Sequence, residues 1–223
     1  SRALVVGISN APANGTGNLN ETLTNTTTSP VTVTYAYTLS TGGCSNPSVY
    51  NVKVVVNPTM TLSSTLTPPA ICSNSLFTYT PTSASPGVAF TWSRAAVAGI
   101  SNAPAAGAGN VSETLISTSA VPVVVTYAYS LSAGGCTNTY NVTVTVNPTP
   151  ALTSTLTPPA ICSNTMFSYV PTSGTAGTIF AWNRPAVAGI SNAAASGTGN
   201  PNETLVNTTA APVAVSYIYT LTA

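Results

Sequence analysis

The sequence predicts an all-β protein built from tandem β-sandwich modules of about 90 residues. Three observations lead to this prediction. Apolar residues recur with a period of two, clusters of turn-forming residues separate the apolar segments, and the sequence repeats itself. No segment has the 3.6-residue periodicity of an amphipathic helix, so the regular elements should all be strands.

Internal repetition sets the domain organisation. Residues 57–133 align without gaps with residues 147–223, and 48 of these 77 positions are identical. The first 56 residues align with the latter part of the same unit, with two extra residues after the Gly-Gly-Cys turn. We interpret the chain as a window onto a longer array. We expect residues 1–56 to be the C-terminal part of a first repeat, 57–146 a complete second repeat, and 147–223 a third repeat lacking its last strand.

Each unit contains short segments in which apolar and polar residues alternate. Residues 123–131 place Val, Tyr and Leu on one face, and residues 140–146 place Tyr and Val on one face. Residues 77–79 and 90–92 are shorter versions. All four are rich in β-branched and aromatic residues, as strands of a two-sheet sandwich are. The expected core aromatics are Phe77, Tyr79, Phe90, Trp92, Tyr127, Tyr129 and Trp182.

The charge composition excludes many functions. Only seven side chains are charged, the net charge is +1, and the chain has neither His nor Asp. Without His there is no imidazole base for Ser-His-Asp or Cys-His catalysis, and too few ligands for a zinc cluster. A net charge of +1 offers no basic surface to a nucleic acid. We expect no enzyme activity, no cofactor, no metal site and, without a long apolar run, no membrane span in this segment.

Six of the seven charges form a repeated pattern. One Arg and one Glu recur in each unit, always 19 residues apart, whereas Lys53 lies outside the pattern. In the middle unit the Arg shares a strand face with an aromatic pair, where a charge is tolerated mainly when it is paired. We predict a partly buried, bidentate ion pair in each module, with stacking on Trp as an option; the alternative is a surface pair of little energetic value. The pairs are Arg2–Glu21, Arg94–Glu113 and Arg184–Glu203.

Several motifs occur in the same order in each unit and carry a family resemblance. They include Ile-Cys-Ser-Asn, Phe-x-Trp-x-Arg, Gly-x-Gly-Asn-x-x-Glu-Thr-Leu, Gly-Gly-Cys and Tyr-Asn-Val-x-Val-x-Val-Asn-Pro. The chain resembles the PKD-like, immunoglobulin-like repeats of very large cell-surface proteins of gliding-type Gram-negative bacteria. This resemblance implies exported β-sandwich modules that serve in adhesion or in extracellular fibres. PKD domains proper carry Trp-Asp-Phe-Gly-Asp-Gly where this chain has Trp92-Ser93-Arg94, so no calcium role carries over.

The four cysteines allow more than one disulfide pattern. One pattern closes Cys72–Cys136 within the middle unit and leaves Cys44 and Cys162 to partners outside the window. The rival pattern bridges neighbouring modules as Cys44–Cys72 and Cys136–Cys162. An immunoglobulin-like topology would argue against a bridge within a module, because it places the two cysteines at opposite ends. We prefer the bridge within the middle unit.

These observations favour a structural function over a chemical one. The leading hypothesis is an extracellular repeat array at a bacterial cell surface, acting as the stalk of a giant adhesin or as the body of a filament. Its partners would be neighbouring modules of the same chain and identical chains in a fibre. The alternative is a carbohydrate-binding module of a secreted adhesin, for which surface glycans would be the partner. That alternative requires two or more exposed aromatic rings on one surface.

Overall fold

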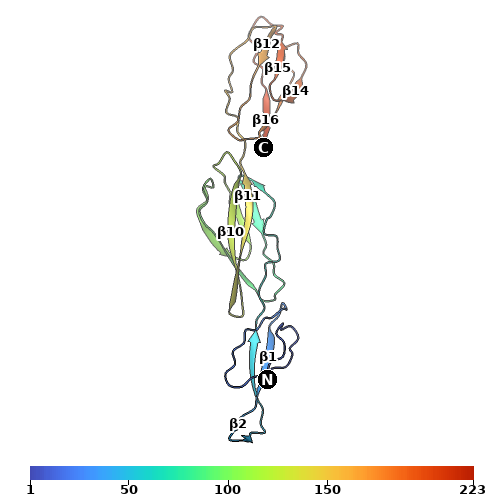
Figure 1. Ribbon diagram of the computed structural model, residues 1–223. Coiled ribbons are helices and arrows are strands. Elements are labelled where there is room, and N and C mark those ends of the chain that lie inside the picture. Colours follow the sequence, from blue (N-terminus) through green and yellow to red (C-terminus); the bar gives the residue numbers. More distant parts are fainter.

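The computed structural model describes residues 1–223, which form sixteen strands and no helix. Figure 1 shows three β-rich bodies in a single row, with the N-terminus in the lowest and the C-terminus in the highest. We call residues 1–56, 57–146 and 147–223 modules 1, 2 and 3. No helix is present that is long and apolar enough to cross a membrane.

Module 2 is a sandwich of two sheets. The larger sheet has the order β5-β11-β10-β7-β8, in which β5 runs parallel to β11 and all other neighbours are antiparallel. The smaller sheet pairs β6 with β9. The predicted all-β, immunoglobulin-like sandwich is therefore confirmed. The strands are β5 Ile71–Cys72, β6 Ser75–Tyr79, β7 Ala89–Arg94, β8 Ala105–Ala108, β9 Val111–Leu115, β10 Val123–Ala133 and β11 Cys136–Asn147.

A long hairpin of β10 and β11 forms the centre of module 2. The pair Ala133–Cys136 closes it on Gly134 and Gly135, whose φ values of 55° and 79° are those of a tight turn with two left-handed residues. Only glycine adopts this conformation at both positions without strain. Along the hairpin, inward and outward side chains alternate as the period-two pattern predicts.

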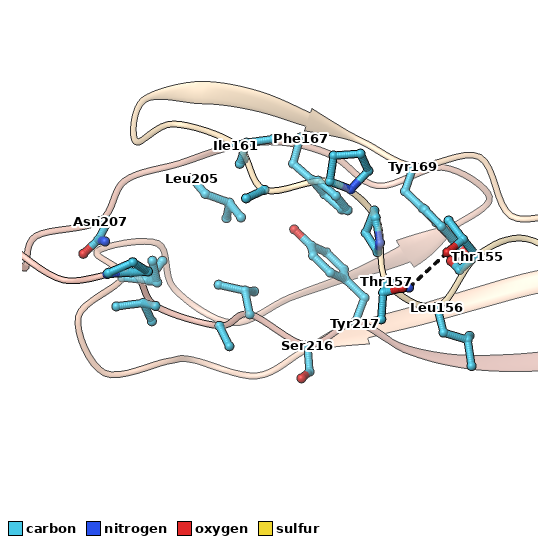
Figure 2. Close-up of a pocket in the computed structure, with 18 of the residues that line it drawn as sticks. Thr155, Leu156, Thr157, Ile161, Phe167, Tyr169, Leu205, Asn207, Ser216 and Tyr217 are labelled. Atoms are coloured by element: carbon cyan, nitrogen blue, oxygen red, sulfur yellow. Dashed lines mark hydrogen bonds between the residues drawn. The ribbon is translucent and has the colours of Figure 1, made fainter.

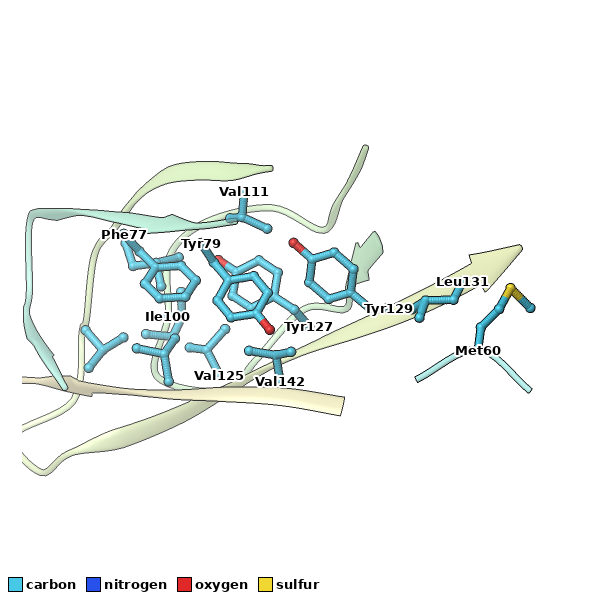
Figure 3. Packing of buried hydrophobic residues seen from close by; sticks show 13 residues of the cluster. Met60, Phe77, Tyr79, Ile100, Val111, Val125, Tyr127, Tyr129, Leu131 and Val142 are labelled. Carbon is cyan, nitrogen blue, oxygen red and sulfur yellow. The ribbon is translucent and has the colours of Figure 1, made fainter. Parts of the chain in front are cut away.

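The core of module 2 lies between its two sheets and holds thirteen buried apolar residues (Figure 3). Phe77 of the small sheet stacks on Tyr127 of the large sheet, with 5.3 Å between ring centroids, and Tyr79 meets Tyr129 at 5.4 Å. These aromatic pairs fix the position of strand β6 of the small sheet over strand β10 of the large sheet. The strand β11 seals the core with Val142, Val144 and Val146, all fully buried.

Module 1 contains the hairpin but little of the opposite sheet. Its strands are β1 Val31–Tyr37, β2 Ser40–Thr41, β3 Cys44–Ser45 and β4 Tyr50–Val56. The hairpin is interrupted where Pro47 and the two extra residues lie, because proline has no N–H to offer a neighbouring strand. Its buried apolar cluster has three residues, Ile8, Val33 and Tyr35.

Module 3 repeats module 2 up to the first strand of that hairpin. Its strands are β12 Thr165–Ser168, β13 Ile179–Arg184, β14 Ala195–Thr198, β15 Asn202–Leu205 and β16 Ile218–Thr222, in sheets β14-β13-β16 and β12-β15. No strand corresponds to β11. Residues 213–217, which align with the first half of β10, consequently form no strand.

Candidate functional site

A buried Arg–Glu–Tyr cluster connects the two sheets of module 2. Arg94, the last residue of β7, is 1% exposed. Its Nε donates to Oε2 of Glu113 and its Nη2 to Oε1, both at 3.0 Å, and Nη2 also donates to the Ala103 carbonyl at 2.7 Å. The Tyr127 hydroxyl donates to Oε2 of Glu113 at 2.7 Å. The ion pair is thus bidentate and is held by a third side chain.

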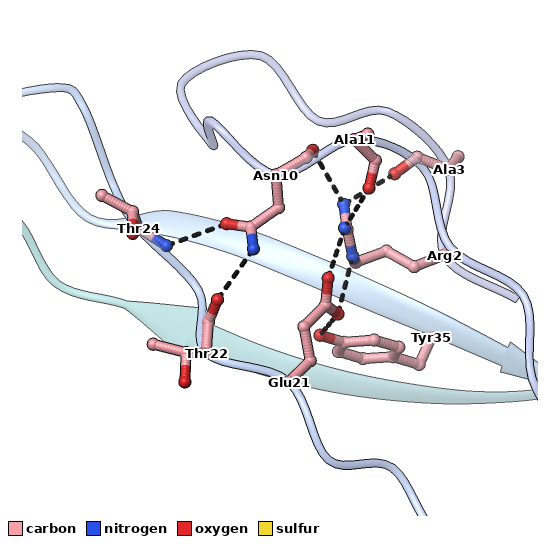
Figure 4. Close-up of polar contacts among 8 residues, drawn as sticks. All are labelled: Arg2, Ala3, Asn10, Ala11, Glu21, Thr22, Thr24 and Tyr35. Atoms are coloured by element: carbon pink, nitrogen blue, oxygen red, sulfur yellow. Dashed lines mark hydrogen bonds and ion pairs between the residues drawn. The ribbon is translucent and has the colours of Figure 1, made fainter.

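The same cluster recurs in the other two modules. In module 3, Arg184 Nε lies 2.8 Å from Oε2 of Glu203, and the Tyr217 hydroxyl donates to the same oxygen at 2.6 Å. In module 1, Arg2 contacts Glu21 and the Ala11 carbonyl, and Tyr35 donates to Glu21 (Figure 4). In all three the Tyr follows the Glu by 14 residues.

The role of this tyrosine was not predicted from the sequence. The constant spacing was visible as the first Tyr of each Val-x-Tyr-x-Tyr motif. Stacking on Trp was an option in the ion-pair prediction; the third side chain that the structure shows bonded to each ion pair is a tyrosine. We call each set of Arg, Glu and Tyr the cradle.

The cradle holds each group in its ordinary ionisation state. Hydrogen bonds from Arg184, together with one from Tyr217, outweigh burial and lower the pKa of Glu203. The bond to Glu203 raises the pKa of Arg184, and burial raises that of Tyr217. At neutral pH the carboxylate is therefore charged and fully engaged. The carboxylate of Glu203, whose side chain is 16% exposed, accepts hydrogen bonds from Arg184 and Tyr217 and so joins strand β15 of one sheet to strand β13 of the other.

In modules 2 and 3 a tryptophan covers the cradle and explains the Gly-x-Gly-Asn motif. Trp92 packs edge-on against Tyr127 with ring centroids 5.7 Å apart, and its ring lies against the backbone of Gly107. A Cβ at Gly107 would lie 2.9 Å from the indole, which is too close. Gly109, with φ of 68°, then turns the chain into β9. The first glycine of the motif makes room for the indole and the second makes the turn.

Comparison with known families gives one match. Residues 69–150 match the PKD-like domain. The matched range runs from just before β5 to just after β11, and so covers most of module 2. A search of curated proteins found no match to the chain.

The other two modules resemble the PKD-like module in detail. Module 3 shares 48 of 77 aligned positions with it, and all three modules contain the cradle. Modules 1 and 3 differ from the PKD-like module mainly in the strands that they lack.

An open apolar groove of about 560 Å³ runs along module 3 at the place that β11 occupies in the PKD-like module (Figure 2). Phe167, Tyr169, Tyr217 and Tyr219 line it, and all four are half-buried. Their counterparts in module 2 pack against the valines of β11 and are buried. The groove is therefore a sandwich core that has no closing strand.

The structure overturns the expected disulfides. All four cysteines are free and exposed. Cys72 lies beside Asn147 at one end of β11, whereas Cys136 begins that strand eleven residues earlier, roughly 36 Å away along an extended chain. A disulfide requires Cα atoms within about 7 Å, so the preferred Cys72–Cys136 bridge is wrong.

The rival disulfide pattern is also wrong. Cys44 lies at the tip of the module 1 hairpin, at the bottom of Figure 1, and Cys72 at the far end of module 2. Cys162, the counterpart of Cys72, lies at the far end of module 3, whereas Cys136 lies near the junction of modules 1 and 2. Neither Cys44–Cys72 nor Cys136–Cys162 can form within this arrangement.

The expected core aromatics are placed on the apolar side of their strands. Phe77, Tyr79, Tyr127 and Tyr129 are buried. The remaining three, Phe90, Trp92 and Trp182, are half-buried. Tyr50 is the one aromatic side chain in the exposed class, so two exposed rings do not share a surface.

Proposed function

We propose that this chain is part of a non-enzymatic extracellular array that acts as a mechanical spacer, the stalk of a bacterial surface adhesin or the body of a filament. The PKD-like match of the middle module supports an extracellular structural module. The end-to-end row of Figure 1 supports the spacer role. The charged groups support it as well, because six of the seven are engaged in cradles.

The observation that carries the proposal is the way in which module 2 ties its first segment to its last strand. Asn138 Nδ2 donates to the Met60 carbonyl at 2.9 Å, and the Thr143 amide donates to the Leu66 carbonyl at 2.8 Å. Further along, β5 pairs with the end of β11. The two segments therefore run parallel along most of the module.

This parallel arrangement determines how the module responds to tension. The chain enters at one end of module 2 and leaves at the other, so a pull along the row slides the first segment against β11. Bonds that lie across a sliding pair bear load together, whereas bonds at a peeling edge break one at a time. A module of this kind resists extension, as a stalk or fibre under load requires.

Immunogold electron microscopy tests the proposed location and role. Antibodies raised against the 223-residue chain are applied to intact cells that make the protein, and to permeabilised cells as the control. We expect gold particles along surface threads or fibres of intact cells. Labelling that requires permeabilisation contradicts the proposal. Uniform fibres with an axial repeat of one or two modules favour the filament, and isolated threads favour the stalk.

A further inference from the structure

The junction between modules 1 and 2 is made by the Gly-Gly-Cys turn. Asn57 directly follows β4, the last strand of module 1, and its Nδ2 donates to the Gly134 carbonyl at 2.6 Å. The contact is close, because a Cβ at Gly134 would lie 2.5 Å from that nitrogen. The hairpin of module 2 therefore reaches back to the end of the preceding module. Cys136 lies two residues after the contacting glycine and is exposed.

The same asparagine recurs at the junction between modules 2 and 3. Asn147 aligns with Asn57 in the repeat and ends β11 as Asn57 follows β4. In module 2 strand β5 is present, and it places a cysteine beside Asn147. Cys72 is the register partner of Asn147, and the Ser73 amide donates to the Asn147 carbonyl at 2.7 Å.

These two observations place two kinds of cysteine at one asparagine. At the start of a module, the cysteine of its Gly-Gly-Cys turn lies two residues after the glycine that contacts the asparagine, as Cys136 does near Asn57. At the end of a module, the cysteine of its strand β5 pairs with the asparagine, as Cys72 does with Asn147. Both kinds of cysteine therefore lie at the same kind of junction, and Cys72 lies on the strand next to Asn147, at the roughly 5 Å spacing of neighbouring strands. Within this chain the junction of modules 1 and 2 contains Cys136 and the junction of modules 2 and 3 contains Cys72, and neither junction contains a second cysteine.

Module 3 is positioned to receive the missing hairpin strand at its junction with module 2. Ala223 aligns with Ala133, which precedes the Gly-Gly-Cys turn, and it lies at the end of module 3 that faces module 2 (Figure 1). The open groove begins four residues back along the chain, at Tyr219, and follows the chain to Pro212. A strand that starts with this turn would bring its cysteine to Cys72 and its valines into the groove.

We propose that the groove of module 3 binds the last strand of a further copy of this repeat, with a sequence like residues 134–147, and that its hairpin cysteine forms a disulfide with Cys72. The exposed apolar face of β4 supports a strand of this sequence as the occupant. Its pattern Tyr-Asn-Val-x-Val-x-Val is that of β11, and Val52 and Val54 are 52% and 40% exposed.

Disulfide formation removes two electrons and two protons from the two thiols. An oxidised low-molecular-weight disulfide such as oxidised glutathione accepts them and is released as two thiols. The proposal deepens the proposed function, on which it rests only for an oxidising compartment. Since the test below supplies its own oxidant, its failure would refute the junction without bearing on the cellular location.

The test uses the full chain, reduced, mixed with a synthetic peptide of residues 134–147 and oxidised glutathione. Non-reducing peptide mapping then identifies the cross-linked cysteines. We expect the peptide cysteine on Cys72 in preference to the other three by on the order of tenfold or more, because docking in the groove raises the local thiol concentration. Hydrogen exchange should slow across residues 213–219, which the peptide strand would pair with. Equal labelling of all four cysteines, or unchanged exchange, overturns the proposal.

Two matched variants separate docking from cross-linking. C72S should lose the cross-link and keep the slowed exchange, whereas C162S, at the equivalent position of module 3, should keep both. A peptide in which Val142 and Val144 are replaced by Asn should lose the preference for Cys72, because it cannot fill the apolar groove. If that peptide still labels Cys72 selectively, the groove is not the seat of the strand.

Discussion

Replacing Arg94 by Met tests whether the cradle holds the sandwich together. Met keeps most of the side-chain length but removes the two bonds to Glu113 and the bond to the Ala103 carbonyl. Glu113, with a side chain 16% exposed, would retain one hydrogen bond, from Tyr127. Removing one partner of a buried ion pair costs about 3–5 kcal/mol. We therefore expect the free energy of unfolding of module 2 to fall by about that amount.

The chain offers a clean assay for this effect. It has two tryptophans, one in module 2 and one in module 3. In a W182F background, urea unfolding followed by Trp92 fluorescence reports module 2 alone. Adding Glu113→Gln to Arg94→Met should restore part of the loss, because no unpaired charge remains, but the Ala103 carbonyl still lacks its donor, at about 1–3 kcal/mol. A loss below about 1 kcal/mol for Arg94→Met would refute the buried cradle.

Three further predictions concern pH, packing and the junction. The pKa of Glu113 lies below its ordinary 4.5, so we expect module 2 to lose stability as the pH falls below about 4.5, and E113Q to abolish that dependence in urea titrations. In a W92F background, where Trp182 fluorescence reports module 3, Gly197→Ala should cost about 1–3 kcal/mol because its methyl group would overlap the Trp182 indole, whereas Gly174→Ala in the same module, with open space around it, should be nearly neutral. Gly134→Ala should make the junction between modules 1 and 2 flexible in small-angle X-ray scattering, and Gly135→Ala, equally left-handed but free of contacts, should not; unchanged scattering from Gly134→Ala contradicts that contact.

Much of the fold was predictable because it depends on local patterns. Alternation along residues 123–131 and 140–146 indicated two strands, and the Gly-Gly-Cys sequence between them indicated a turn. The repeated spacing of Arg94 and Glu113 indicated that the two must meet, since isolated charges on apolar faces are unfavourable.

The remaining features depended on how distant segments are brought together. Tyr127 looked like one more core aromatic, because no local pattern shows which hydroxyl ends beside a carboxylate. Cys72 and Cys136 carry no local signal of the end of the sandwich at which each lies. The parallel pairing of β5 with the end of β11 places Cys72 at the opposite end of the sandwich from Cys136. The disulfide prediction was wrong because the sequence does not show this pairing.

The central claim, that these modules are mechanical spacers that resist extension, is tested most directly by pulling a single chain from its two ends. We expect module 2 to unfold in one step, with a contour-length gain of roughly 31 nm, from about 90 residues that extend at about 3.5 Å each, less the folded length of the module. Asn138→Ala, which removes the bond to Met60, should lower the unfolding force, and Asn141→Ala, an exposed position on the same strand, should leave it unchanged. Gradual extension at low force without a distinct step would contradict the account.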